Sequence, residues 1–204
     1  MTTIPSFVFS LLLIAPISLI SALPNVTAIR IGDGCSAYPT YLPDPSNNFT
    51  GCFVLHPDQA DNSSINGLHT GPQGTSLVVY SDPMAASELF GCTNGTIFDY
   101  FIAPSAATQW SFLTNPQDQE LISSSQGIRP ETYAHEVDGV RQDGVFLGSA
   151  NSTTWAFRLV LGAGGIGGRD FYQVRLLEPK NADPVMGIAL RDGEFKGFLK
   201  VIQP

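Results

Sequence analysis

Basic residues are scarce in this sequence, above all in its first two thirds. The 204-residue chain holds ten Lys and Arg against eighteen Asp and Glu, giving a formal net charge of −8 at pH 7. Between residues 23 and 128 the only Lys or Arg is Arg30. Such a surface repels both the phosphate backbone of nucleic acids and anionic lipid headgroups. We therefore expect no nucleic-acid partner and no membrane-surface role.

Recognisable catalytic and metal-binding motifs are also missing. The three histidines, His56, His69 and His135, are too few and too dispersed in the sequence to match a metal-ligand spacing. No nucleophile-elbow, zinc-protease or calcium-loop pattern occurs. Glu136 follows His135 directly, and neighbours on a strand point to opposite faces, so these two are not expected to converge. The sequence predicts no bound metal, and an enzyme would have to use residues that no motif marks.

Long hydrophobic runs are limited to one, at residues 7–20. Its fourteen residues are too few to span a bilayer comfortably, and small residues follow it. We interpret residues 1–22 as a signal peptide cleaved after Ala22, which leaves residues 23–204 as a single secreted domain with no membrane partner. Because no Lys or Arg precedes the run, an uncleaved anchor is the alternative.

Asn-x-Ser/Thr triplets are frequent, and they support export. A glycan needs a surface position, so the acceptor asparagines are expected in exposed loops. The five predicted glycosylation sites are Asn25, Asn48, Asn62, Asn94 and Asn151.

Cysteine is rare, with Cys35, Cys52 and Cys92 the only three. In an oxidising compartment one pair forms a disulfide and one thiol is left over. The spacing does not decide which two residues pair.

Short β-branched and aromatic segments, separated by Gly, Pro, Asn and Asp, dominate the mature chain. This pattern predicts an all-β domain, an antiparallel barrel or sandwich. Residues 108–113 resemble residues 154–159, each with one Trp, and this repeat makes a β-trefoil the alternative. One short helix is expected near residues 83–90, because Asp82 suits its N-cap, Pro83 its first position and Gly91 its end. A hairpin is expected around Asp192-Gly193, with residues 186–190 and 195–202 as its strands.

The glycine-rich stretch at residues 162–167 has two incompatible interpretations. It satisfies G-x-G-x-x-G after an apolar strand, as in a dinucleotide-binding turn followed by a helix. However, strand-forming residues follow it, and the chain lacks the βα alternation of a doubly wound sheet. The alternative is a hairpin in which Phe157 faces Val174 and Leu159 faces Tyr172, because only this register gathers the apolar side chains on one face. We favour the hairpin and expect no cofactor.

In that register Arg158 and Arg175 lie on a cross-strand diagonal, within reach of one shared anion. They either bind a carboxylate or phenolate in a barrel mouth, or pair with the plentiful acidic residues. The candidate catalytic residues are His56, His135, Arg158, Tyr172 and Arg175.

Three classes of function remain open from the sequence. The first is a secreted ligand-binding domain, which holds a small apolar molecule in a barrel mouth or a carbohydrate on a loop face. The second is a cofactor-independent isomerase or cyclase on the same scaffold. The third is a structural or host-interaction protein.

Overall fold

The fold is almost entirely β-sheet, as the sequence predicts. The computed structural model describes residues 25–32, 34–44, 47–102, 109–112, 120–162, 168–177 and 190–204. These residues form sixteen strands and one short 3-10 helix, η1, Ser63–Ile65. Among them, no helix is long and apolar enough to cross a membrane. The predicted signal peptide, residues 1–22, lies outside the described residues.

The strands are short, and most hold four to six residues. Their bounds, in chain order, are β1 Thr27–Arg30, β2 Tyr41–Asp44, β3 Asn47–Thr50, β4 Val54–Asp58, β5 Thr70–Gln73, β6 Ser76–Tyr80, β7 Phe90–Thr93, β8 Thr96–Asp99, β9 Gln109–Phe112, β10 Leu121–Ser123, β11 Glu131–Val137, β12 Val140–Arg141, β13 Val145–Gly148, β14 Trp155–Val160, β15 Phe171–Leu176 and β16 Glu194–Ile202.

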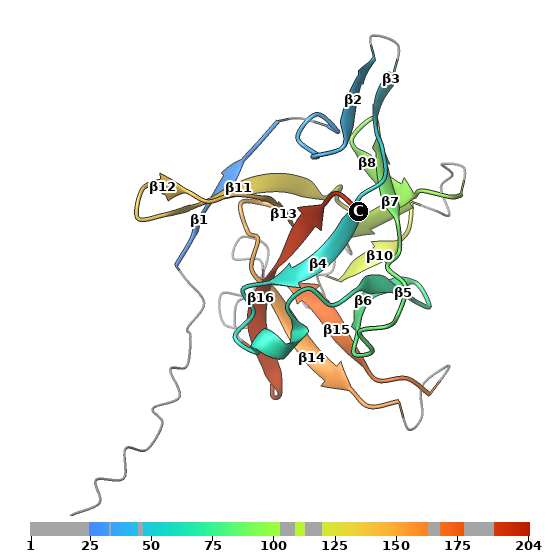
Figure 1. Cartoon of the computed structure of the whole chain (residues 1–204), viewed down its shortest axis with the longest axis vertical. Coiled ribbons are helices and arrows are strands. Elements are labelled where there is room, and N and C mark those ends of the chain that lie inside the picture. Colours follow the sequence, from blue (N-terminus) through green and yellow to red (C-terminus); the bar gives the residue numbers. More distant parts are fainter. Residues whose placement is uncertain are drawn as a thin grey trace, which may run out of the picture.

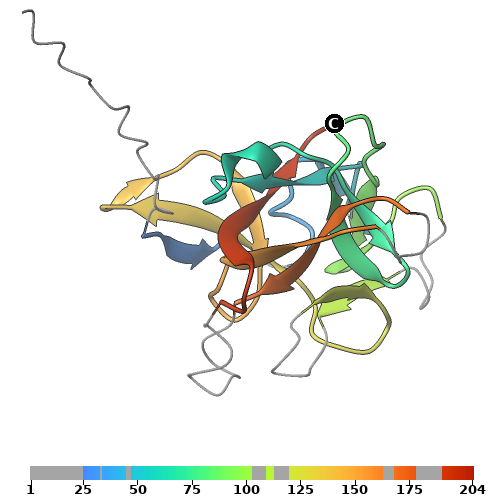
Figure 2. The same cartoon turned by 90° about the horizontal axis from the view of Figure 1, so that it is seen from below.

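All strand pairs are antiparallel, and they form one continuous sheet with the order β1-β11-β13-β16-β14-β15-β6-β10-β9-β8-β7-β3-β2. Three strands branch from this path: β12 pairs with β11, β4 with β16 and β5 with β6. The strand order does not close on itself, and the architecture fits the sandwich- or barrel-like all-β class. Figure 1 shows the β2–β3 hairpin and the β11–β12 hairpin projecting from the strongly twisted central part, and Figure 2 shows the β11–β12 hairpin from a second side. The three-fold arrangement of a trefoil stays a prediction.

The β14–β15 hairpin has the register that the sequence predicts. Phe157 pairs with Val174, and Leu159 pairs with Tyr172. Phe157 and Val174 are buried in the core, so the alternation of apolar side chains selects this pairing. Because residues 171–176 form a strand, the helix that a dinucleotide-binding turn requires is absent there. Residues 163–167 at the glycine-rich tip lie outside the described residues.

The predicted helix at residues 83–90 is wrong. Asp82 does cap a turn, because its Oδ1 accepts from Met84 N at 2.9 Å and its carbonyl accepts from Ala85 N at 3.0 Å. The chain then becomes extended. Glu88 N donates to Thr70 O of β5 at 2.9 Å, and Phe90 exchanges two backbone hydrogen bonds with Phe53. These strand partners satisfy the backbone groups that a helix would have used.

The predicted hairpin around Asp192-Gly193 lies only partly within the described residues. Residues 192 and 193 form a turn, and β16 follows it at Glu194–Ile202. Its predicted partner is residues 186–190, of which 186–189 fall outside the described residues and Leu190 is not assigned to a strand. Within the part of the chain that is described, β16 pairs with β4, β13 and β14.

The core is filled by large aromatic and aliphatic side chains from most strands of the sheet. Trp110, Trp155 and Phe157 are at most 1 % exposed, and each such side chain contributes roughly 2 kcal/mol through burial. The two Trp N–H groups are satisfied, by Asp99 Oδ1 at 2.7 Å and by Leu147 O at 3.0 Å. The interior is therefore occupied by protein side chains.

A disulfide joins Cys35 and Cys92, and it settles the pairing that the sequence leaves open. Both cysteines are fully buried in the core cluster, with Cα atoms 5.6 Å apart. The bond ties the irregular segment after β1 to strand β7. Cys52 is a half-buried free thiol.

We predict that the Cys35–Cys92 bond is a main contributor to stability. It spans a sequence separation of 57 residues, and closing a loop of that size in the unfolded chain stabilises the fold by about 4 kcal/mol. Chemical unfolding of Cys35→Ser/Cys92→Ser should show a loss of this order. Cys52→Ser is the matched control and should unfold within about 1 kcal/mol of the parent. Equal losses in the two proteins would contradict the assigned pairing.

Candidate functional site

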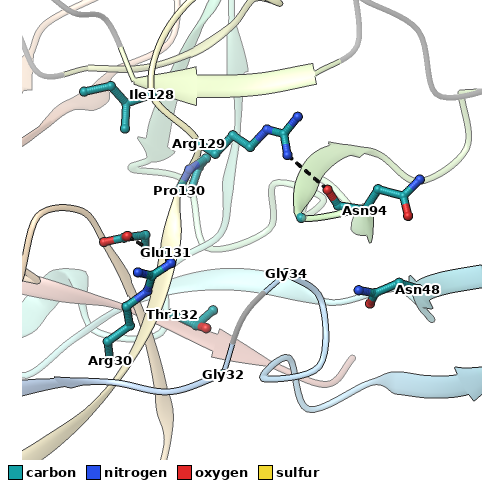
Figure 3. Close-up of a pocket in the computed structure, with 11 residues that line it drawn as sticks. Arg30, Gly32, Gly34, Asn48, Asn94, Ile128, Arg129, Pro130, Glu131 and Thr132 are labelled. Carbon is teal, nitrogen blue, oxygen red and sulfur yellow. Dashed lines mark hydrogen bonds and ion pairs between the residues drawn. The ribbon is translucent and has the colours of Figure 1, made fainter.

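A polar pocket of about 580 Å³ lies where β1, β3, β11 and the β7–β8 turn approach one another (Figure 3). Its size is within the range of small-molecule sites. The segments that form it are far apart in the sequence. The side chains on which the site depends are Arg30, Asn48, Asn94, Arg129, Glu131 and Thr132.

Two arginines give this pocket its positive charge. Arg129 is exposed, and its Nη1 donates to the Asn94 carbonyl at 3.2 Å, so the guanidinium extends toward the β7–β8 turn (Figure 3). Arg30, at the end of β1, pairs with Glu131 at 3.3 Å, and half of its side chain is exposed. Arg30 and Arg129 therefore line the same pocket although 99 positions separate them in the sequence.

Two hydrogen bonds fix the position of the Glu131 carboxylate. Its Oε2 accepts a short hydrogen bond from the Tyr133 hydroxyl and another from Ala150 N at 3.1 Å. The Tyr133 hydroxyl also accepts from Asn151 N at 2.8 Å. Burial and the hydrogen bond to Glu131 raise the pKa of Tyr133 above its usual value, so the phenol stays protonated. This arrangement fixes the carboxylate that positions Arg30.

Glycines keep the neighbouring part of the pocket narrow and free of side chains. A Cβ on Gly34, whose φ is +64°, would lie 3.0 Å from Asn48 Nδ2. A Cβ on Gly95, whose φ is +77°, would lie 3.2 Å from the Gly34 Cα. The disulfide lies directly below, since Gly95 N donates to Cys35 Sγ at 3.2 Å. The Asn48 Oδ1 is buried here without a hydrogen-bond partner.

Arg175 does not reach a pocket, because Glu194 binds it. The two side chains are 6 % and 4 % exposed and form a bidentate pair at 2.8 and 2.6 Å. Burial opposes ionisation of Glu194, but hydrogen bonds from Arg175 and Arg191 outweigh it and lower its pKa. Arg175 therefore pairs with an acidic residue of the protein, which is the second of the two interpretations drawn from the sequence.

Arg158 lies on the same face as Arg175 and donates to Gln173 Oε1 at 2.7 Å. Gln173 donates in turn to Glu120, which accepts from Ser76 Oγ at 2.9 Å. Neither arginine lines the main pocket or either of two smaller pockets of about 430 and 250 Å³.

The two remaining aromatic candidates are packing residues. Tyr172 lies on the opposite face of β15 from Arg175 and packs edge-on against Phe195, with ring centroids 6.0 Å apart. His135 is 1 % exposed and stacks on Phe146 at 3.6 Å. Burial lowers its pKa to about 4. The structure therefore does not bring the five predicted catalytic residues together.

His56 has an unexpected neighbour, His69. Their ring centroids are 5.2 Å apart, and the Ser87 hydroxyl lies between them. Thirteen residues separate the two histidines in the sequence, and their side chains meet because β4 and the start of β5 lie close together. No local spacing signals this cluster.

Four of the five predicted glycosylation sites are exposed, and Asn48 is the exception. Its Oδ1 is buried, and its Nδ2 packs against Gly34. The exposed acceptors are Asn25, Asn62, Asn94 and Asn151.

Comparisons with known proteins give no family. No protein-family model matches the chain, and a search of curated proteins finds no similar sequence.

We predict that Glu194→Gln destabilises the protein at neutral pH by about 3 kcal/mol, because it leaves the buried Arg175 charge uncompensated. The folded-state pKa of Glu194 is lowered, so its contribution is present above the unfolded value near 4 and is lost as pH falls through the folded value. The deficit of the variant should therefore shrink below about pH 4. Urea unfolding from pH 7 to pH 3 measures this. A deficit that is constant with pH, or as small as that of the surface control Glu136→Gln, would contradict the assignment.

We predict that Asn48 stays unmodified when the chain is expressed through a secretory pathway, because a glycan on Nδ2 would have to displace Gly34. Glycopeptide mass spectrometry after enzymatic release in heavy-oxygen water marks each used acceptor. Occupancy should appear at the exposed acceptors outside the pocket, Asn25, Asn62 and Asn151. Full occupancy at Asn48 would contradict the packing of its side chain against Gly34.

Proposed function

We propose that this protein is a secreted glycoprotein that binds an acidic carbohydrate in the pocket between Arg30 and Arg129. The disulfide supports an oxidising compartment, because such bonds persist mainly in exported proteins. The observation that carries the proposal is the convergence of two arginines on one polar cavity in a chain with ten basic residues and a net charge of −8.

The charge of the pocket favours a carboxylate. Arg129 presents a planar fork of N–H donors toward solvent, which matches a carboxylate in geometry as well as in charge. Arg30 is half exposed, and its partner Glu131 is already engaged with Tyr133. Among the described lining residues, the two guanidiniums outnumber the one carboxylate, that of Glu131, which favours a negatively charged group there.

The remaining lining suits hydroxyl groups. The exposed Asn94 side chain offers an amide that can both donate to and accept from a sugar hydroxyl. Ile128 and Pro130 supply a small apolar surface against which a sugar ring can lie. A cavity of about 580 Å³ accommodates one or two sugar residues.

The other classes have weaker support. A small apolar ligand needs an apolar cavity, whereas Trp110, Trp155 and Phe157 fill the interior around them. An isomerase needs converging acid–base groups, and His135 and Tyr172 lie apart in packed environments. A host-interaction role stays a hypothesis, because no surface of the described residues supports it specifically.

Calorimetry with trigalacturonic acid tests the proposal. The protein should bind it with one site per chain, and the neutral trisaccharide of galactose should bind more weakly. Arg129→Gln should weaken binding of the acid by about tenfold, because a charge-assisted hydrogen bond is lost.

Arg141→Gln is the matched control. It removes an exposed arginine of the same β11–β12 region that does not line the pocket, and it should leave the affinity unchanged. Binding that Arg129→Gln and Arg141→Gln weaken equally would reflect net charge alone and would overturn the proposal, as would the absence of binding at millimolar ligand.

A further inference from the structure

A second cluster of functional groups lies outside the pocket, around Ser87. Its hydroxyl is within 3.5 Å of His56 Nε2 and makes a short hydrogen bond with His69 Nδ1. The rings meet edge to face with centroids 5.2 Å apart. All three side chains are partly exposed, so the cluster is open to solvent. Two imidazole nitrogens thus face one oxygen atom.

The hydrogen atoms of this cluster can be counted. The Ser87 hydroxyl has one hydrogen, so it can donate to only one ring. When it donates to His69 Nδ1, His56 must carry its proton on Nε2 and donate to Ser87 Oγ. The lone pair on His69 Nδ1 accepts the Ser87 hydrogen, which must turn away before this nitrogen binds an ion. The tautomer of His56 with its proton on Nδ1 directs a second lone pair at the same place.

Three segments hold these side chains in position. Thr70 Oγ1, next to His69, donates to Leu55 O, next to His56, at 2.7 Å. Glu88 N, next to Ser87, donates to Thr70 O at 2.9 Å, and Tyr80 N donates to His69 O at 2.9 Å. The cluster is therefore preorganised by backbone pairing.

The side chain of Lys200 is directed away from the cluster. Lys200 pairs with His56 in the β4–β16 register, but its Nζ lies over the Phe146 ring at 5.9 Å from the centroid.

We propose that His56, His69 and Ser87 form a binding site for one divalent late transition-metal ion of the kind that imidazole prefers, such as Cu²⁺ or Zn²⁺. Two ring nitrogens and the serine oxygen supply three ligands, and water completes the coordination. Within the described ranges no group of three His, Cys, Asp or Glu side chains gathers around a metal position, and Ser87 is the additional oxygen donor that both rings face. The sequence predicts no metal site, because the spacing of the histidines matches no metal-binding motif. Only the fold brings His56 and His69 together.

Electron paramagnetic resonance of untagged protein with one equivalent of Cu²⁺ tests this site directly. The expected spectrum shows hyperfine coupling to two nitrogens, and Zn²⁺ should compete for the same site. His56→Gln and His69→Gln should each reduce the coupling to one nitrogen. Ser87→Ala should weaken Cu²⁺ binding by about tenfold while both nitrogens remain.

Two features of the chain limit the binding of Cu²⁺ to other described side chains. The third histidine, His135, is 1 % exposed and contributes no surface ligand. Cys52→Ser controls for the free thiol and should bind as the parent does. Glutamine retains hydrogen-bonding groups, and an unchanged unfolding midpoint confirms that each variant is folded.

Three results would overturn the proposal. The first is a spectrum of wild-type protein without nitrogen coupling. The second is a two-nitrogen spectrum that persists in His56→Gln/His69→Gln. The third is loss of binding in Cys52→Ser, which would place the ion on the thiol.

Discussion

The Cys35–Cys92 disulfide is the constraint on which the candidate site depends. It fastens the irregular segment after β1 to β7 inside the core, where both cysteines are fully buried. Gly34 is thereby brought against the β7–β8 turn, and Gly95 binds the Cys35 sulfur from above. Without this link, no covalent bond would hold the segment that follows Arg30 against β7, and the wall that Gly34 and Gly95 form would lose its anchor.

Electrostatic pairing divides the arginines of the sheet into two kinds. Glu194 binds Arg175 in a bidentate ion pair that is buried from solvent. This interaction links β15 to the start of β16. Arg129 is exposed and contacts a backbone carbonyl. A buried guanidinium paired with a carboxylate, such as that of Arg175, stabilises the fold. An exposed guanidinium, such as that of Arg129, is available to a ligand. This difference, together with the presence of Arg30 in the same pocket, locates the candidate site.

Periodic patterns in the sequence predict some of this architecture well. The alternation around Phe157 and Val174 selects the β14–β15 register because one face is buried. The helix expected at residues 83–90 fails because Asp82 is only a local signal, while pairing of Glu88 and Phe90 with distant strands is stronger. Neither the pocket nor the His56–Ser87–His69 cluster has a local pattern. Their residues come from separate strands, and only the fold places them together.

The central claim is that an anionic sugar binds where the disulfide, the two glycines and Arg129 meet. Backbone amide shifts during titration with trigalacturonic acid test it most directly, because they report position as well as affinity. The account predicts saturable shifts at Gly34, Gly95 and Thr132, all of which line the pocket. Shifts confined to other parts of the sheet, such as β14 and β15, would contradict it.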